Sequence, residues 1–116
     1  MTYGAHVRRI REARRSKDRS FSLRQVAKRI GVEPAYLSKI ERGEVAPPSE
    51  VVTRKLAEEL NEDVDVLLAM SGKVSTDLRD IILNRPALFA DLIRQLRGLP
   101  DHAIVRIVRE VRDGEW

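Results

Sequence analysis

The segment that decides the fold runs from Gln25 to Gly43 and reads QVAKRIGVEPAYLSKIERG. Gly31 directly follows Ile30, at the position where a helix often ends in the left-handed conformation that glycine adopts without steric cost. Pro34 suits the first position of a new helix, because that position needs no backbone donor. The segment therefore predicts two short helices, at about residues 22–30 and 34–42, joined by a tight turn.

Apolar side chains are spaced so that these two helices pack against each other. Ala27 is small enough for the helices to approach closely, and Ser22 stands three residues before Gln25, the spacing of a capping box in which each side chain satisfies the other's backbone donor. The side chains expected to face inward and hold the interhelical angle are Val26, Ile30, Val32, Leu37 and Ile40. Tyr36, Ser38 and Lys39 are expected to remain outside.

The rest of the chain also reads as helical, and no strand pattern persists. A first helix is expected at about residues 4–16, with Val7, Ile10 and Ala13 as its apolar stripe, and a fourth at about 49–60, with Asn61 as its left-handed terminator. A fifth helix is capped by Asp63 and ends before Gly72, and about three more follow. The fold class is therefore all-α, with a five-helix domain at residues 1–72 and a helical extension at 73–116.

Composition excludes several classes of protein. The chain has 116 residues and no cysteine, which excludes disulfide scaffolds, iron-sulfur clusters and cysteine nucleophiles. Its longest purely apolar run, Val66–Met70, is far shorter than the ~20 residues that cross a bilayer, and its start lacks a signal-peptide core. His6 and His102 are far apart in sequence, and no catalytic motif occurs. We therefore expect a soluble cytoplasmic protein without enzymatic activity, metal, cofactor or membrane contact.

Charge is concentrated at the front of the chain. Residues 1–31 carry a net charge of +8, residues 32–72 carry −5, and residues 73–116 carry +1, although the whole chain is only +4. A basic region of this kind attracts polyanions, most commonly nucleic acid and next an anionic membrane surface. The alternative is an Arg-rich helix face that is only solvated. A DNA major groove admits one α-helix, so the helix that begins at Pro34 could enter the groove while the helix before it crosses the phosphate backbone.

The sequence SLRQVAKRIGVEPAYLSKIERG resembles the Xre family of helix-turn-helix regulators, of the Cro and phage-repressor type. The resemblance covers about residues 4–71, and the positions that carry it are Ala27, Gly31, Leu37, Ile40, Glu41 and Gly43. It implies a five-helix domain that binds double-stranded DNA, with the docking geometry described for phage repressors.

The resemblance also implies which residues touch DNA. The base-reading positions of the family correspond to Glu33, Pro34, Ala35, Ser38 and Lys39. Pro34 and Ala35 offer only apolar contact to a thymine methyl, so Lys39 is expected to be the best direct reader and Ser38 the second. Leu23 stands where the family often has a phosphate-binding Gln, and the substitute phosphate contacts are expected to be Arg24, Lys28 and Arg42.

Three acidic residues near this surface have separate interpretations. Glu33 and Glu44 would repel phosphate unless they accept from cytosine or point away. Glu41 and Arg14 match positions that form a partly buried ion pair between the first and third helices in many relatives. We expect that pair here, with a surface pair of little energetic value as the alternative.

The extension at 73–116 has apolar stripes that need a partner surface. A single domain of this type reads half a site, and twofold dimers on palindromic operators are the usual solution. We expect residues 73–116 to form a homodimer through Phe89, Leu92, Leu96, Ile104, Ile107, Val108 and Val111; packing onto their own domain is the alternative. The function expected is a DNA-binding transcriptional repressor. The alternative function is an antitoxin or anti-activator whose C-terminal helices bind a partner protein.

Overall fold

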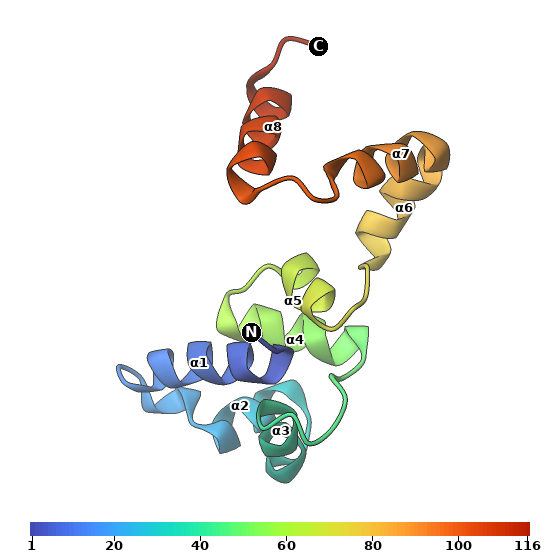
Figure 1. Cartoon of the computed structure of the whole chain (residues 1–116). Coiled ribbons are helices and arrows are strands. Elements are labelled where there is room, and N and C mark those ends of the chain that lie inside the picture. The colour runs from blue at the N-terminus through green and yellow to red at the C-terminus, as the bar shows by residue number, and fades with distance from the viewer. The chain divides into compact units, whose positions relative to one another are not determined.

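The computed structural model describes residues 1–116, and every regular element in it is a helix (Figure 1). The elements are α1 (Tyr3–Arg15), the 3-10 helix η1 (Arg19–Phe21), α2 (Leu23–Ile30), α3 (Pro34–Glu41), α4 (Glu50–Leu60), α5 (Val64–Met70), α6 (Thr76–Asn84), α7 (Pro86–Leu96) and α8 (Asp101–Asp113). The all-α prediction is confirmed, and the first five helices start and end within about two residues of their predicted bounds. None of the helices is long and apolar enough to cross a membrane.

The chain forms two compact units, Met1–Leu78 and Arg79–Trp116. The first unit extends beyond Gly72 because Ser75 is buried and Thr76 donates through its backbone N–H to the Glu50 carboxylate at 3.0 Å. The predicted division of roles between residues 1–72 and 73–116 remains a prediction.

A single core holds the first unit together. The side chains of Val26, Ala27, Ile30, Leu37 and Ile40 are buried as predicted, and Val32 packs against them half-buried. α4 and α5 complete the core with Leu56, Leu60 and Leu67, among others. Burial of an aliphatic side chain of this size contributes about 1.5–3 kcal/mol, so the α2–α3 pair is stabilised mainly by its inner face.

The buried stripe of α1 differs from the prediction. Val7 is buried and Ile10 half-buried, but Ala13 is exposed. The stripe instead runs through Tyr3, Val7 and Arg11, which are spaced four residues apart and lie on one face of the helix. The Tyr3 hydroxyl lies 2.9 Å from the Thr53 hydroxyl of α4. Burial raises the pKa of the Tyr3 phenol, and the contact with Thr53 partly offsets that rise.

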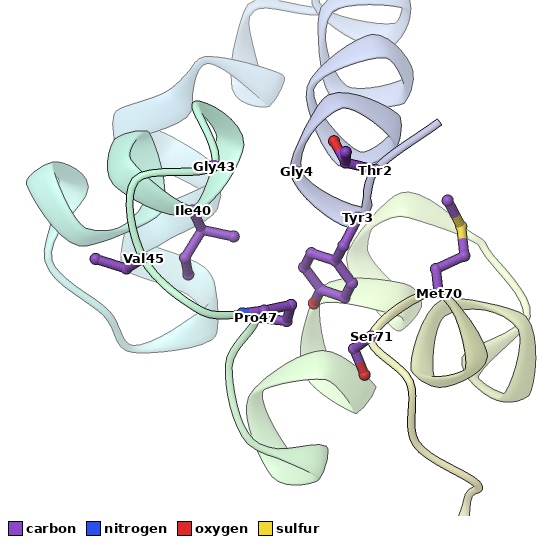
Figure 2. Close-up of a pocket in the computed structure, with 9 residues that line it drawn as sticks. All are labelled: Thr2, Tyr3, Gly4, Ile40, Gly43, Val45, Pro47, Met70 and Ser71. Atoms are coloured by element: carbon purple, nitrogen blue, oxygen red, sulfur yellow. The ribbon is translucent and has the colours of Figure 1, made fainter.

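Gly4 allows α1 to approach the end of α3 closely (Figure 2). A Cβ at this position would overlap the backbone carbonyl oxygen of Ile40 and would press on that of Glu41. A hollow of about 320 Å³ opens beside this contact, and its walls include Tyr3, Ile40 and Met70. The phenol of Tyr3 is the hollow's only titratable side chain, so this site offers no charge to a ligand.

The segment between α1 and α2 is more ordered than the predicted polar turn. Residues Arg19–Phe21 form η1, and the Ser22 backbone N–H donates to the Arg19 carbonyl at 3.1 Å. The Ser22 hydroxyl does accept from the Gln25 N–H at 3.2 Å. The predicted reciprocal capping box is therefore wrong in its second half, because η1 already satisfies the donor that Gln25 was expected to bind.

The second unit, Arg79–Trp116, contains most of α6 together with α7 and α8. None of its side chains is buried. Large apolar side chains are exposed on each helix, for example Ile81, Leu88 and Val111 at 50%, 69% and 58%. This unit therefore lacks a core comparable to that of the first.

Candidate nucleic-acid interface

The turn between α2 and α3 has the predicted geometry. Gly31 adopts φ 76° and ψ 32°, and its N–H donates to the Lys28 carbonyl while that of Val32 donates to the Ala27 carbonyl. This pattern closes α2 in a left-handed cap and leaves the chain free to turn. Pro34 then opens α3, and the Glu33 carbonyl accepts the first two helical hydrogen bonds, from Tyr36 and Leu37.

α3 has a buried face and an exposed face. Leu37, Ile40 and Glu41 are buried, whereas Ala35, Lys39 and Arg42 are exposed. These three exposed residues follow the spacing of one helix face, since residues three, four and seven apart lie above one another. Tyr36 is also exposed on α3, and Ser38 is half-buried.

The predicted base-reading residues therefore lie at the start and along the outer side of α3. Glu33 is exposed and makes no side-chain cap, and Pro34 is half-buried at the first helical position. The side chain of Lys39, the cation that is predicted to read bases, is exposed.

The predicted phosphate-binding residues Arg24, Lys28 and Arg42 are exposed as well. Arg42 has local partners: its Nε donates to the Ser38 carbonyl at 3.3 Å, and its guanidinium lies 3.0 Å from the Glu44 carboxylate. The concern that Glu44 would repel phosphate is reduced by this pair, because Arg42 offsets the charge of the carboxylate. Both side chains are about half exposed, so the pair contributes little to stability.

A groove of about 250 Å³ between α1 and α3 adds cations that the sequence interpretation missed. Arg8 and Arg15 line it from α1, opposite Ser38 and Arg42. These two arginines are seven residues apart and therefore lie on one helical face. The net charge of +8 in residues 1–31 indicated a basic surface in this part of the chain. It could not show which of the ten Lys and Arg residues lie beside α3, because that depends on how the helices pack.

Two residues that line this groove, Arg11 of α1 and Glu41 of α3, form a buried ion pair. The Arg11 Nε donates to Glu41 Oε2 at 2.7 Å, and a second guanidinium nitrogen donates to Oε1 at 2.9 Å. Both side chains are only 3% exposed. Arg11 also donates to the Phe21 carbonyl at 3.2 Å and to the Glu12 carboxylate at 3.1 Å. The hydrogen bonds to Glu41 raise the pKa of the Arg11 guanidinium, which therefore keeps its charge despite burial.

This arrangement corrects the predicted pairing of Glu41 with Arg14. The Arg14 guanidinium instead lies 5.5 Å from the centre of the Phe21 ring, and that of Arg29 lies 5.4 Å from it. Arg11 reaches Glu41 because it continues the buried stripe four residues after Val7. The bidentate pair orients α3 relative to α1. It therefore also fixes the direction in which the exposed face of α3 points.

Comparison with protein families identifies the first unit. The family described as the helix-turn-helix domain matches residues 2–69, more than half of the chain. Comparisons with curated proteins and with solved structures gave no match. The matched range covers α1 to α5 almost completely, including the α2–α3 pair and the buried Arg11–Glu41 pair. The chain therefore belongs to the helix-turn-helix domain family, whose members carry this arrangement of helices as a DNA-binding domain.

Proposed function

We propose that this chain is a sequence-specific transcriptional regulator of the Xre type that represses by binding a palindromic operator as a homodimer. Its role is binding, not catalysis. The observation that carries the proposal is the exposed face of α3, where Lys39 and Arg42 lie opposite an inner face that is apolar apart from Glu41, which is paired with Arg11. A charged helix face held on a rigid core is what insertion into a major groove requires.

Sequence would be read mainly by Lys39. A Lys ammonium recognises the O6 and N7 acceptors of guanine, and Ser38 can bond to more than one base. Pro34 and Ala35 would contact a thymine methyl, and Glu33 would accept from cytosine or turn towards solvent. The proposed operator half-site therefore contains at least one guanine that Lys39 reads.

Affinity would come mainly from phosphate contacts. Arg24, Lys28 and Arg42 are exposed around the α2–α3 pair, and Arg8 and Arg15 extend the basic surface along α1. Phosphate contacts fix the register of a protein on the duplex but do not read its sequence. Base reading by Lys39 and phosphate binding by Arg24 therefore make separable contributions.

The experiment that tests this proposal compares Lys39→Ala with Arg24→Ala. Operator DNA is first obtained by selecting bound fragments from a random pool, and affinities are then measured for selected and random duplexes. Lys39→Ala should cost about 1–3 kcal/mol on selected DNA and relax the preference at one position, whereas Arg24→Ala should weaken both duplexes alike. Equal losses from Lys39→Ala on both duplexes would remove Lys39 from the base readers.

Dimerisation through residues 73–116 is part of this proposal. One α2–α3 pair covers a half-site, and a twofold dimer matches a palindromic site. The absence of buried side chains in Arg79–Trp116 supports a surface that another chain covers.

The same exposed apolar side chains favour a second candidate function, an antitoxin or anti-activator that holds a different protein. Deletion of residues 79–116, which keeps the whole first unit with its buried Ser75, separates the two. If the second function is correct, an unrelated chain co-purifies with the full protein and is lost on deletion. If the first is correct, the full protein purifies as a homodimer that footprints its operator, and deletion leaves a monomer.

A further inference from the structure

α8, Asp101–Asp113, carries one continuous apolar stripe. It consists of Ile104, Ile107, Val108 and Val111, at the i, i+3, i+4 and i+7 spacing of a single helix face. Val108 and Val111 are 54% and 58% exposed, and the two isoleucines are half-buried. Units below about 40 residues rarely fold on their own core without a disulfide, a metal or oligomerisation. Since the chain has no cysteine and no cluster of His, Asp and Glu side chains that could hold a metal ion, a partner surface is the source of stability that is left for this unit.

Two charges flank the stripe at opposite ends of the helix. Asp101 and Arg112 are eleven residues apart, which is about three helical turns, so they lie on the same side of α8 and about 16 Å apart. The Arg112 guanidinium lies 3.1 Å from the neighbouring Asp113 carboxylate, but both side chains are about two-thirds exposed. A pair this exposed contributes little and exchanges readily for another carboxylate.

We propose that α8 pairs antiparallel with α8 of a second copy, with the twofold axis between Ile107 and Val108. The inference rests on the proposed homodimer and specifies its interface. In this register Ile104 faces the partner's Val111, Ile107 faces the partner's Val108, and the axis repeats each contact. The four stripe residues of each copy then cover those of the other without a gap.

Charge complementarity selects the second copy and the antiparallel direction. In an antiparallel pair, the same side of the apolar stripe on each helix faces its counterpart on the other helix. Asp101 of each copy therefore lies beside Arg112 of the other, and two symmetric ion pairs form. In a parallel pair both Asp101 carboxylates would lie at the same end, eleven residues from either Arg112. Antiparallel helices also bring the positive N-terminal end of each dipole beside the negative C-terminal end of its partner.

α7 must contribute to the same interface. A 13-residue helix pair buries less than the ~1,200 Å² typical of a stable interface. The apolar side chains of α7 provide further area, with Leu88 and Leu92 exposed at 69% and 47%. The α8 pair therefore sets the register, and α7 extends the contact.

Disulfide cross-linking of the full chain tests the register, and the lack of native cysteines makes each result unambiguous. Val108→Cys places a thiol next to the axis, where it meets its own symmetry copy. A thiol at position 104 or 111 is displaced from its copy by seven residues, about 10 Å along the helices, which exceeds the ~7 Å Cα separation that a disulfide spans. Val105→Cys, with similar exposure on the same helix but off the stripe, is the matched control.

The expected result is a disulfide-linked dimer from Val108→Cys, and none from Ile104→Cys, Val111→Cys or Val105→Cys alone. An equal mixture of the Ile104→Cys and Val111→Cys proteins should link to each other. Self-linking of Val111→Cys as fast as that of Val108→Cys would overturn the antiparallel direction. A monomer in sedimentation equilibrium, or a dimer in which none of the stripe thiols link, would overturn the α8 pair.

Charge reversal gives an independent readout at exposed positions. Asp101→Arg should raise the dimer Kd on the order of tenfold, because it loses two ion pairs and adds two like-charge contacts. The double variant Asp101→Arg/Arg112→Asp should restore the original Kd, and no restoration would contradict the pairing. DNA binding is measured separately. A protein that cross-links as expected but does not bind DNA would refute the proposed regulator function and leave the α8 pair standing. A dimer that binds DNA but cross-links in another register would refute the α8 pair and leave the regulator function standing.

Discussion

The buried pair between α1 and α3 gives the most quantitative prediction. In Arg11→Met the Glu41 carboxylate stays in a site where it is only 3% exposed and loses hydrogen bonds of 2.7 and 2.9 Å. Removal of one partner of a buried pair costs about 3–5 kcal/mol. Since whole domains are stable by only about 5–15 kcal/mol, this loss is a large fraction of the total.

The assay is urea unfolding of the full chain followed by far-UV circular dichroism, at one fixed protein concentration because a dimer links stability to concentration. Arg11→Met should lower the free energy of unfolding by about 3–5 kcal/mol, and at least about 12 °C of Tm should be lost with it. The double variant Arg11→Met/Glu41→Leu should recover most of the loss, because a buried pair replaced by apolar side chains is often neutral.

Arg14→Ala is the matched control, since it removes a guanidinium from the same helix. Its contact with Phe21 is worth about 0.5–1 kcal/mol at a site of this exposure. If Arg11→Met lowered the free energy of unfolding by no more than Arg14→Ala does, the claim that the Arg11–Glu41 pair holds α3 against α1 would be refuted.

The other predictions concern backbone approach, burial and helix ends. Gly4→Ala should lower the free energy of unfolding by about 1–3 kcal/mol, because the added Cβ overlaps the Ile40 carbonyl and α1 must shift. An unchanged urea midpoint would show that there is room for a Cβ between α1 and the end of α3. Burial raises the pKa of the Tyr3 phenol above its ordinary 10.0, so the folded state holds this proton more tightly, and stability is lost as pH rises past 10.0. Urea unfolding of Tyr3→Phe on either side of that pH should show a smaller loss than the original chain, and equal losses would assign the effect to other groups. Asn61→Ala should cost about 1 kcal/mol of stability, because Asn61 ends α4 at φ 53°; Asn61→Gly is the control and should unfold at nearly the original urea concentration.

The positions of the helices were predictable because local chemistry fixes them. Gly31 and Asn61 both adopt the left-handed conformation that ends their helices, and Pro34 begins α3. The inner face of the α2–α3 pair followed from apolar spacing alone. Such signals act within a few residues and can be read without knowledge of the tertiary structure.

The buried pair was harder to assign because burial of a charge depends on a distant partner. Arg11 lies on the stripe of Tyr3 and Val7, but a charged residue on a stripe gives no sign of burial until Glu41, thirty residues away, is placed against it. Ala13 was expected to be inside because it is apolar and correctly spaced, yet α1 ends two residues later and nothing covers it.

The interface was predictable in part. α3 and its outer residues followed from the motif, but the approach of Arg8 and Arg15 to Ser38 and Arg42 depends on how α1 crosses α3. The ion pair of Arg42 with Glu44 also appears only in three dimensions. The predicted DNA contacts themselves stay predictions until binding is measured.

The most direct test of the central claim is the salt dependence of duplex binding by the purified full chain. A dimer that uses Arg24, Lys28 and Arg42 of each copy neutralises at least six phosphates, so log K should fall with log salt at a slope at least as steep as about −5. Selected DNA should bind more tightly than random DNA at every salt concentration. Failure to bind any duplex at low salt, or binding without a salt dependence, would contradict the account.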